Sequence, residues 1–201
     1  MVRKWQLAVL ALAVMMLSAA CNSYAAPPSG VKIGDAAPDW SGIIGVDDKE
    51  HGLADYKKAK LVVMVFTCNH CPVAVAYEDR LVALQEAYKD KGVQVIAVNV
   101  NNLPADRLDK MKVRAEEKEF NFPYLYDASQ KMGRDYGAQV TPHVFVLDRK
   151  RRIAYIGAID DNNNSKRVEA KYLSDALDAL LAGKQPDPAE TKPRGCGVKY
   201  D

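Results

Sequence analysis

Two unbroken apolar runs, separated by a segment of helix length, constrain the fold of this chain more than any other feature. The first covers residues 61–66 (LVVMVF) and the second covers residues 93–100 (VQVIAVNV). Short β-branched runs without polar alternation are typical of strands that are buried on both faces. Between the runs, apolar residues recur every three or four positions from Val73 to Tyr88, and Gly92 supplies a stop. The pattern predicts a strand–helix–strand crossover and therefore a parallel pair of strands.

The other segments extend this start into a single α/β domain. They predict a mostly exposed helix at 104–119 that begins at Pro104, a short strand at 122–126, a short helix at 129–136, a β-hairpin of strands 143–147 and 153–156, and an amphipathic helix from 168 that ends at Gly183. We therefore expect the domain to cover residues 43–183. An extended arm rich in Pro, Gly and Ala, residues 26–42, precedes it, and a tail with three prolines, residues 184–201, follows it.

Residues 1–25 have the composition of a secretory signal peptide. Arg3 and Lys4 precede a wholly apolar run at 7–17, and small residues suit cleavage after Ala25. The run is far shorter than the roughly 20 residues that span a bilayer. We therefore expect an exported protein, with the periplasm as its compartment. One alternative stays open, because residues 18–21 loosely fit a lipoprotein cleavage box that would place a lipid anchor on Cys21.

The charge balance argues against a nucleic-acid partner. The chain has 28 lysines and arginines against 26 aspartates and glutamates, and two of the basic residues lie in the predicted leader. The remainder carries 26 of each sign, so it has no net positive charge to steer it toward nucleic acid. With 48% apolar residues, the chain can bury a core.

The motif Cys68-Asn69-His70-Cys71-Pro72 lies where the first buried strand gives way to its helix. This location predicts that Cys68 is at the helix N-terminus, where free backbone N–H groups favour an anion, and that Cys71 is one turn further on. Residues three apart on a helix are close enough for a disulfide. The motif therefore predicts reversible thiol–disulfide exchange, in which Cys68 attacks and Cys71 resolves. A structural disulfide or half of a zinc site is the alternative.

Three further residues could take part in this chemistry. An imidazolium at His70 would stabilise the Cys68 thiolate and make the disulfide more oxidising; alternatively, His70 is a solvated residue without this effect. Cys196 is either a resolving thiol, brought to the pair by a mobile tail, or an unpaired spare. Glu78 either relays the proton of Cys71 or is a solvated acid. Exchange of this kind needs no metal and no other cofactor.

Thr141-Pro142 precedes the hairpin and by itself indicates only a proline at a strand start. Together with the order of elements and the C-x-x-C-P corner, however, it resembles the thioredoxin superfamily over residues 31–183. The resemblance implies a central mixed β-sheet flanked by helices. It also implies that Pro142 is cis and shields the Cys68–Cys71 pair, and that the backbone of Thr141 docks the chain of a substrate.

Four segments are similar to a peroxiredoxin-like redoxin subgroup, related to alkyl hydroperoxide reductase and thiol-specific antioxidant proteins. They are FTCNHCPVAVAYEDRL (66–81), FPYLYD (122–127), IDD (159–161) and GCGVKY (195–200). Peroxiredoxins carry Thr or Ser three residues before the peroxidatic cysteine and a proline earlier in the same loop. Here position 65 is Val, and residues 61–67 contain no proline. The departure favours disulfide exchange over peroxide reduction.

The sequence therefore predicts an exported thiol–disulfide oxidoreductase. Its expected partners are protein or small-molecule thiols and disulfides, and an upstream redox protein. One rival is a thiol peroxidase, in which Cys68 or Cys71 attacks a hydroperoxide and Cys196 could be the resolving thiol. The other rival is a copper-handling binding protein, because the thiolates of Cys68 and Cys71 with one imidazole would suit Cu(I).

Overall fold

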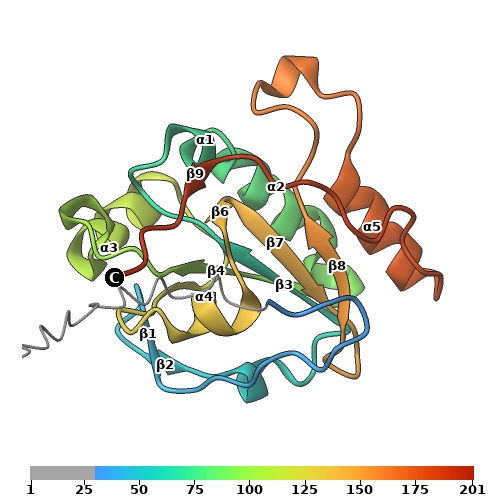
Figure 1. The fold of residues 1–201 in the computed structure, drawn as a ribbon, viewed down its shortest axis with the longest axis horizontal. Coiled ribbons are helices and arrows are strands. Elements are labelled where there is room, and N and C mark those ends of the chain that lie inside the picture. Colours follow the sequence, from blue (N-terminus) through green and yellow to red (C-terminus); the bar gives the residue numbers. More distant parts are fainter. Residues whose placement is uncertain (1–29) are drawn as a thin grey trace, which may run out of the picture.

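The structure is a computed structural model that describes residues 30–201. Its centre is a seven-stranded mixed sheet in the order β2-β1-β5-β4-β3-β7-β8 (Figure 1). These strands are β1 Ile43–Gly45, β2 Glu50–His51, β3 Leu61–Phe66, β4 Val93–Asn99, β5 Tyr124–Tyr126, β7 His143–Leu147 and β8 Ile153–Gly157. Strand β3 is parallel to β4 and antiparallel to β7, and β4 is parallel to β5. A separate two-stranded sheet pairs β6 Val140–Thr141 with β9 Cys196–Gly197.

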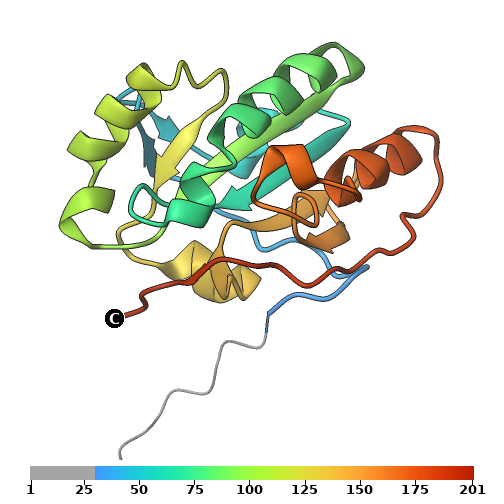
Figure 2. The ribbon, with the colours of Figure 1, turned by 90° about the horizontal axis from the view of Figure 1, so that it is seen from above.

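Helices cover both faces of the sheet (Figure 2). They are α1 Pro72–Val75, α2 Glu78–Tyr88, α3 Leu108–Glu117, α4 Lys131–Tyr136 and α5 Tyr172–Leu181. Residues of α2, α3 and α5 pack on one face, and residues of α4 and of the segment before β1 pack on the other. Successive side chains of β3 enter the two cores alternately, and all six are buried. This explains why β3 is apolar at every position.

Most elements lie where the sequence predicts them. The run at 61–66 forms β3, the run at 93–100 forms β4, and the predicted hairpin forms β7 and β8. The final helix α5 begins at Tyr172 rather than at residue 168, because a 3-10 turn at Ser165–Arg167 precedes it, and it is followed by Gly183 in the left-handed conformation, with φ of +74°. No helix within residues 30–201 has the length and apolar content that a membrane span requires.

Two predicted helices differ from expectation. The segment from Val73 to Tyr88 forms two helices, α1 and α2, and the chain turns between them at Tyr77. The hydroxyl of buried Tyr77 donates a hydrogen bond of 2.7 Å to Asp160, which fixes this turn against another part of the chain. The segment at 104–119 is also divided, because a 3-10 turn at Pro104–Asp106 precedes α3.

The topology brings three separate segments to one edge of the sheet. Because β3 and β4 are parallel, the segments that follow their carboxyl ends emerge at the same edge. The antiparallel strand β7 begins at that edge, so the residues before it, Thr141 and Pro142, lie there as well. In open α/β sheets, functional groups gather at such carboxyl ends.

Candidate functional site

The two cysteines of the C-x-x-C motif lie in the loop between β3 and α1. Cys71, not Cys68, is the N-cap residue of α1, and its Sγ accepts a hydrogen bond of 3.5 Å from the N–H of Ala74. The expectation that Cys68 is at the helix N-terminus is therefore wrong. The helix begins at Pro72, which is suited to the first helical position, and one of the free N–H groups of its first turn, that of Ala74, points at Cys71.

Both thiols contact Thr141, the residue before Pro142. Cys68 Sγ lies 3.2 Å from Thr141 Oγ1, and the thiol of Cys71 donates to the backbone carbonyl oxygen of Thr141 at 3.3 Å. The Thr141–Pro142 peptide bond is cis, as the resemblance implied. Cys68 and Cys71 are 2% and 0% exposed, so their sulfurs lie in a protected pocket rather than on the open surface.

The surroundings shift the pKa values of the two thiols in opposite directions. Burial raises the pKa of Cys68 to about 12; a hydrogen bond with Thr141 opposes this shift, and the charge of Asp106 adds to it. Burial also raises the pKa of Cys71, but hydrogen bonds from the Cys196 thiol and from the N–H groups of Ala74 and Cys196 outweigh it, so the pKa of Cys71 is lowered. These shifts favour Cys71 as the thiolate, whereas the sequence led us to expect Cys68.

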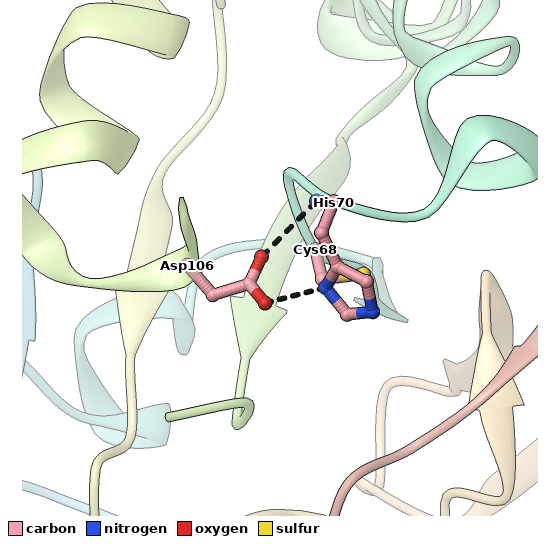
Figure 3. A group of neighbouring side chains, drawn as sticks. All are labelled: Cys68, His70 and Asp106. Atoms are coloured by element: carbon pink, nitrogen blue, oxygen red, sulfur yellow. Dashed lines mark hydrogen bonds and ion pairs between the residues drawn. The ribbon is translucent and has the colours of Figure 1, made fainter. Parts of the chain in front are cut away.

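Asp106 fixes the loop that carries His70 (Figure 3). Its buried carboxylate accepts hydrogen bonds from the backbone N–H groups of Asn69, at 2.8 Å, and of His70, at 3.2 Å. Its second oxygen lies 2.5 Å from His70 Nδ1. A positive charge on His70 would therefore be compensated by Asp106, which reduces the effect on Cys68 that the sequence suggested.

Sequence reasoning missed Asp106. Residues 104–119 contain many charges, and nothing in the pattern distinguishes this acid from the solvated ones. It is buried because Pro104 begins a 3-10 turn rather than an exposed α-helix, and Asn99 donates a hydrogen bond of 2.9 Å to the Asp106 carbonyl from the end of β4.

The same three side chains form a group that could hold a metal ion. Cys68, His70 and Asp106 each offer a ligand atom, and these atoms lie within 4.8 Å of one another. The set differs from the one expected for copper, because its third member is a carboxylate rather than the thiolate of Cys71. Cu(I) prefers soft ligands, so the donor set suits the copper-handling alternative poorly.

The two remaining candidates from the sequence have definite positions. Glu78 is buried and forms a bidentate ion pair with Arg114 of α3, whose Nε and Nη2 donate to its two carboxylate oxygens at 2.8 and 2.7 Å. Glu78 is therefore neither a free proton relay nor a solvated acid. Cys196 in β9 packs against the cluster of Cys68, Cys71 and Ala74. The structure thus gathers every cysteine among residues 30–201 at one place.

Comparison with known proteins now adds to this geometry. The family model described as Redoxin matches residues 32–173, which include the C-x-x-C loop, Asp106 and Thr141-Pro142. The chain belongs to the Redoxin family. Comparison with curated proteins gives no match.

Two solved structures resemble this Redoxin chain over nearly their whole length. One is a hypothetical protein from Sinorhizobium meliloti, with 31% identity, a TM-score of 0.80 and coverage of 86% of this chain and 96% of the other. The second is an uncharacterized conserved protein from Geobacillus kaustophilus, with 36% identity, a TM-score of 0.76 and coverage of 85% and 93%. A third, a candidate thiol:disulfide interchange protein DsbE from Chlorobium tepidum, has 26% identity, a TM-score of 0.55 and coverage of 63% and 85%.

These likenesses confirm the thioredoxin-like α/β fold that the sequence suggested. The structural neighbours belong to the thioredoxin superfamily and include interchange-type and peroxidoxin-type proteins. Membership of the Redoxin family, together with the likeness to the interchange protein, supports a redox function based on thiols.

Proposed function

We propose that the protein is a thiol–disulfide oxidoreductase whose Cys68–Cys71 pair alternates between dithiol and disulfide. The observation that carries the proposal is the convergence of both thiols on Thr141, one on its hydroxyl at 3.2 Å and the other on its carbonyl oxygen at 3.3 Å. Both thiols therefore lie beside one residue, and Cys68 and Cys71 pack in one buried cluster, as an exchanging pair requires.

The reaction we propose is an exchange in two steps. A thiolate of the pair attacks a disulfide of the partner, and one partner sulfur leaves as a thiolate that takes up a proton. The second thiol of the pair loses its proton and attacks the mixed disulfide, which releases the other partner sulfur and leaves Cys68–Cys71 as the disulfide. A dithiol protein upstream then returns two electrons and two protons to the pair. The lowered pKa of Cys71 supports Cys71 as the first thiolate and Cys68 as the resolving thiol.

Reduction of insulin disulfides in the presence of dithiothreitol tests the proposal. We expect the parent chain to accelerate the reaction, and we expect Cys68→Ser and Cys71→Ser each to reduce the rate to that of dithiothreitol alone, because each variant lacks one sulfur of the pair. A far-ultraviolet spectrum of each variant controls for folding. If both folded variants kept the parent rate, the Cys68–Cys71 pair would not be the exchanging pair.

The geometry gives hydroperoxides less support as substrates. The cavity that Cys68 lines has a volume of about 10 Å³, which is about the space for one water molecule. The raised pKa of Cys68 leaves little of its thiolate to attack a peroxide, so a peroxidase reaction would have to begin at Cys71. We expect stopped-flow oxidation of the reduced chain by hydrogen peroxide to be no faster than that of a free thiol.

We further propose that the chain acts outside the cytosol. The support is the composition of residues 1–25, which lie outside the described residues. In an oxidising compartment, the Cys68–Cys71 pair would meet partner disulfides routinely. Fractionation of the native host, with mass analysis of the mature N-terminus, distinguishes cleavage after Ala25 from lipid attachment at Cys21, and recovery of the uncleaved chain in the cytosol would contradict export.

A further inference from the structure

The C-terminal segment lies beside β6, the strand that contains Thr141 (Figure 1). Strand β9 pairs antiparallel with β6, so that Cys196 is opposite Thr141 and Gly197 is opposite Val140. The pairing continues beyond β9, because the N–H of Val198 donates a hydrogen bond of 3.0 Å to the carbonyl of Gln139. This is the edge that the resemblance to thioredoxins assigns to the chain of a substrate.

Gly195 permits an unusually close approach to this edge. A Cβ atom at position 195 would lie 1.9 Å from the carbonyl oxygen of Thr141 and 2.6 Å from the carbonyl carbon, so any side chain there would push the segment away. A Cβ atom at Gly197 would meet nothing within 4 Å. The two glycines that flank Cys196 thus differ sharply: position 195 requires glycine, whereas position 197 has room for a larger residue.

The close approach places the sulfur of Cys196 against the active-site cluster. Cys196 packs on the group of Cys68, Cys71 and Ala74. Against the effect of burial, hydrogen bonding with the Cys196 thiol lowers the pKa of Cys71, and the same contact raises the pKa of Cys196. Cys71 therefore lies next to two other thiols, those of Cys68 and Cys196.

The rest of the segment is anchored on both sides. The Lys199 N–H donates to Asn101 Oδ1 at 2.8 Å, and Gln130 holds the carbonyl of Lys199 and the N–H of Asp201, each at 2.8 Å. The Tyr200 hydroxyl donates to the carbonyl of Ala138 at 2.7 Å. The sequence suggested that a mobile tail carries Cys196, whereas residues 195–201 are docked on the domain through the two-residue strand β9 and the hydrogen bonds that follow it.

We propose that Cys196 is a third redox residue, which exchanges disulfides with Cys71 inside the chain. The inference rests on the proposed function, because the Cys68–Cys71 disulfide is its starting state. The Cys196 thiolate attacks Cys71 Sγ, the Cys71–Cys196 bond forms as the Cys68–Cys71 bond breaks, and the proton lost by Cys196 is taken up by the Cys68 thiolate. The number of electrons in the chain is unchanged, and Cys68 becomes a free thiol.

Disulfide mapping tests the step, with Gly195 and Gly197 as a matched pair. The full chain carrying Cys68→Ser is incubated with oxidised glutathione, quenched in acid, alkylated and mapped by mass spectrometry. We expect a Cys71–Cys196 disulfide, formed through a Cys71–glutathione intermediate that Cys196 displaces. Adding Gly197→Ala should leave its yield unchanged, whereas adding Gly195→Ala should reduce it at least about tenfold, because the effective concentration of Cys196 falls.

Two results would overturn the inference. One is persistent glutathione on Cys71 of the Cys68→Ser chain while Cys196 stays free. The other is an equal effect of the two glycine substitutions. The proposed function is tested separately. A parent chain that forms the Cys71–Cys196 disulfide but does not reduce insulin contradicts the oxidoreductase proposal alone. A parent chain that reduces insulin but does not form this disulfide contradicts the role of Cys196 alone.

Discussion

Asp106 contributes to the pKa of a sulfur to which it is not hydrogen-bonded, that of Cys68. Its negative charge raises the pKa of Cys68, after the larger effect of burial. Asp106→Asn keeps an oxygen acceptor for the N–H groups of Asn69 and His70 but removes the charge, so we expect the pKa of Cys68 to fall. The thiolate absorbance of chains that also carry Cys71→Ser and Cys196→Ser, titrated with and without Asp106→Asn, measures this shift. Coincident titration curves would mean that the charge of Asp106 does not act on Cys68.

For single residues, the sequence shows which side chains belong to the site better than it shows how reactive each of them is. Cys68, Cys71 and Thr141-Pro142 can be recognised from residue type, spacing and their place beside a buried strand. The opposite pKa shifts of the two thiols cannot be predicted in this way. They depend on Asp106 and Cys196, which approach from distant segments, and on a helix that begins at Pro72.

The ion pair of Glu78 and Arg114 joins α2 to α3 over the site. Glu78 is 5% exposed, so Arg114→Leu would leave a buried carboxylate with only the more distant ammonium group of Lys118, at 3.9 Å, as its partner. We expect the free energy of unfolding in urea to fall by about 2–3 kcal/mol. Lys131→Leu is the matched control, because its partner Asp135 and its own ammonium group lie near the surface of α4, and it should cost less than about 0.5 kcal/mol. Equal losses of unfolding free energy in the two variants would show that the buried ion pair stabilises the fold no more than the exposed one.

Strands and helices with a clear apolar pattern of their own could be predicted from the sequence. Elements that form only through contact with a distant segment could not. Strands β3 and β4 and helix α5 carry an apolar pattern long enough to identify them. The hairpin of β1 and β2 and the pairing of β6 with β9 involve strands of two or three residues, too short for a pattern. The break between α1 and α2 likewise depends on the contact of Tyr77 with Asp160, which lies 83 residues away.

The whole molecule gathers its chemistry at one edge because of its strand directions. Residues 68–71 follow β3, Asp106 follows β4, and Thr141 precedes the antiparallel β7, so no long loop is needed to bring them together. The same edge accepts β9, which adds the third thiol. A site built in this way is intact only while the sheet is folded. A change of pH that destabilises the fold therefore also disrupts the site.

His143 makes this dependence measurable. It lies at the start of β7, 5% exposed, and burial lowers its pKa to about 4 from 6.5. Between these values the unfolded chain binds a proton that the folded chain does not. The free energy of unfolding should therefore fall by up to about 3 kcal/mol as the pH decreases from about 6.5 to about 4, with no further contribution from His143 at lower pH. His143→Gln should flatten this part of the curve while the two curves stay parallel above pH 7. Parallel curves over the whole range would show that His143 is protonated within the fold.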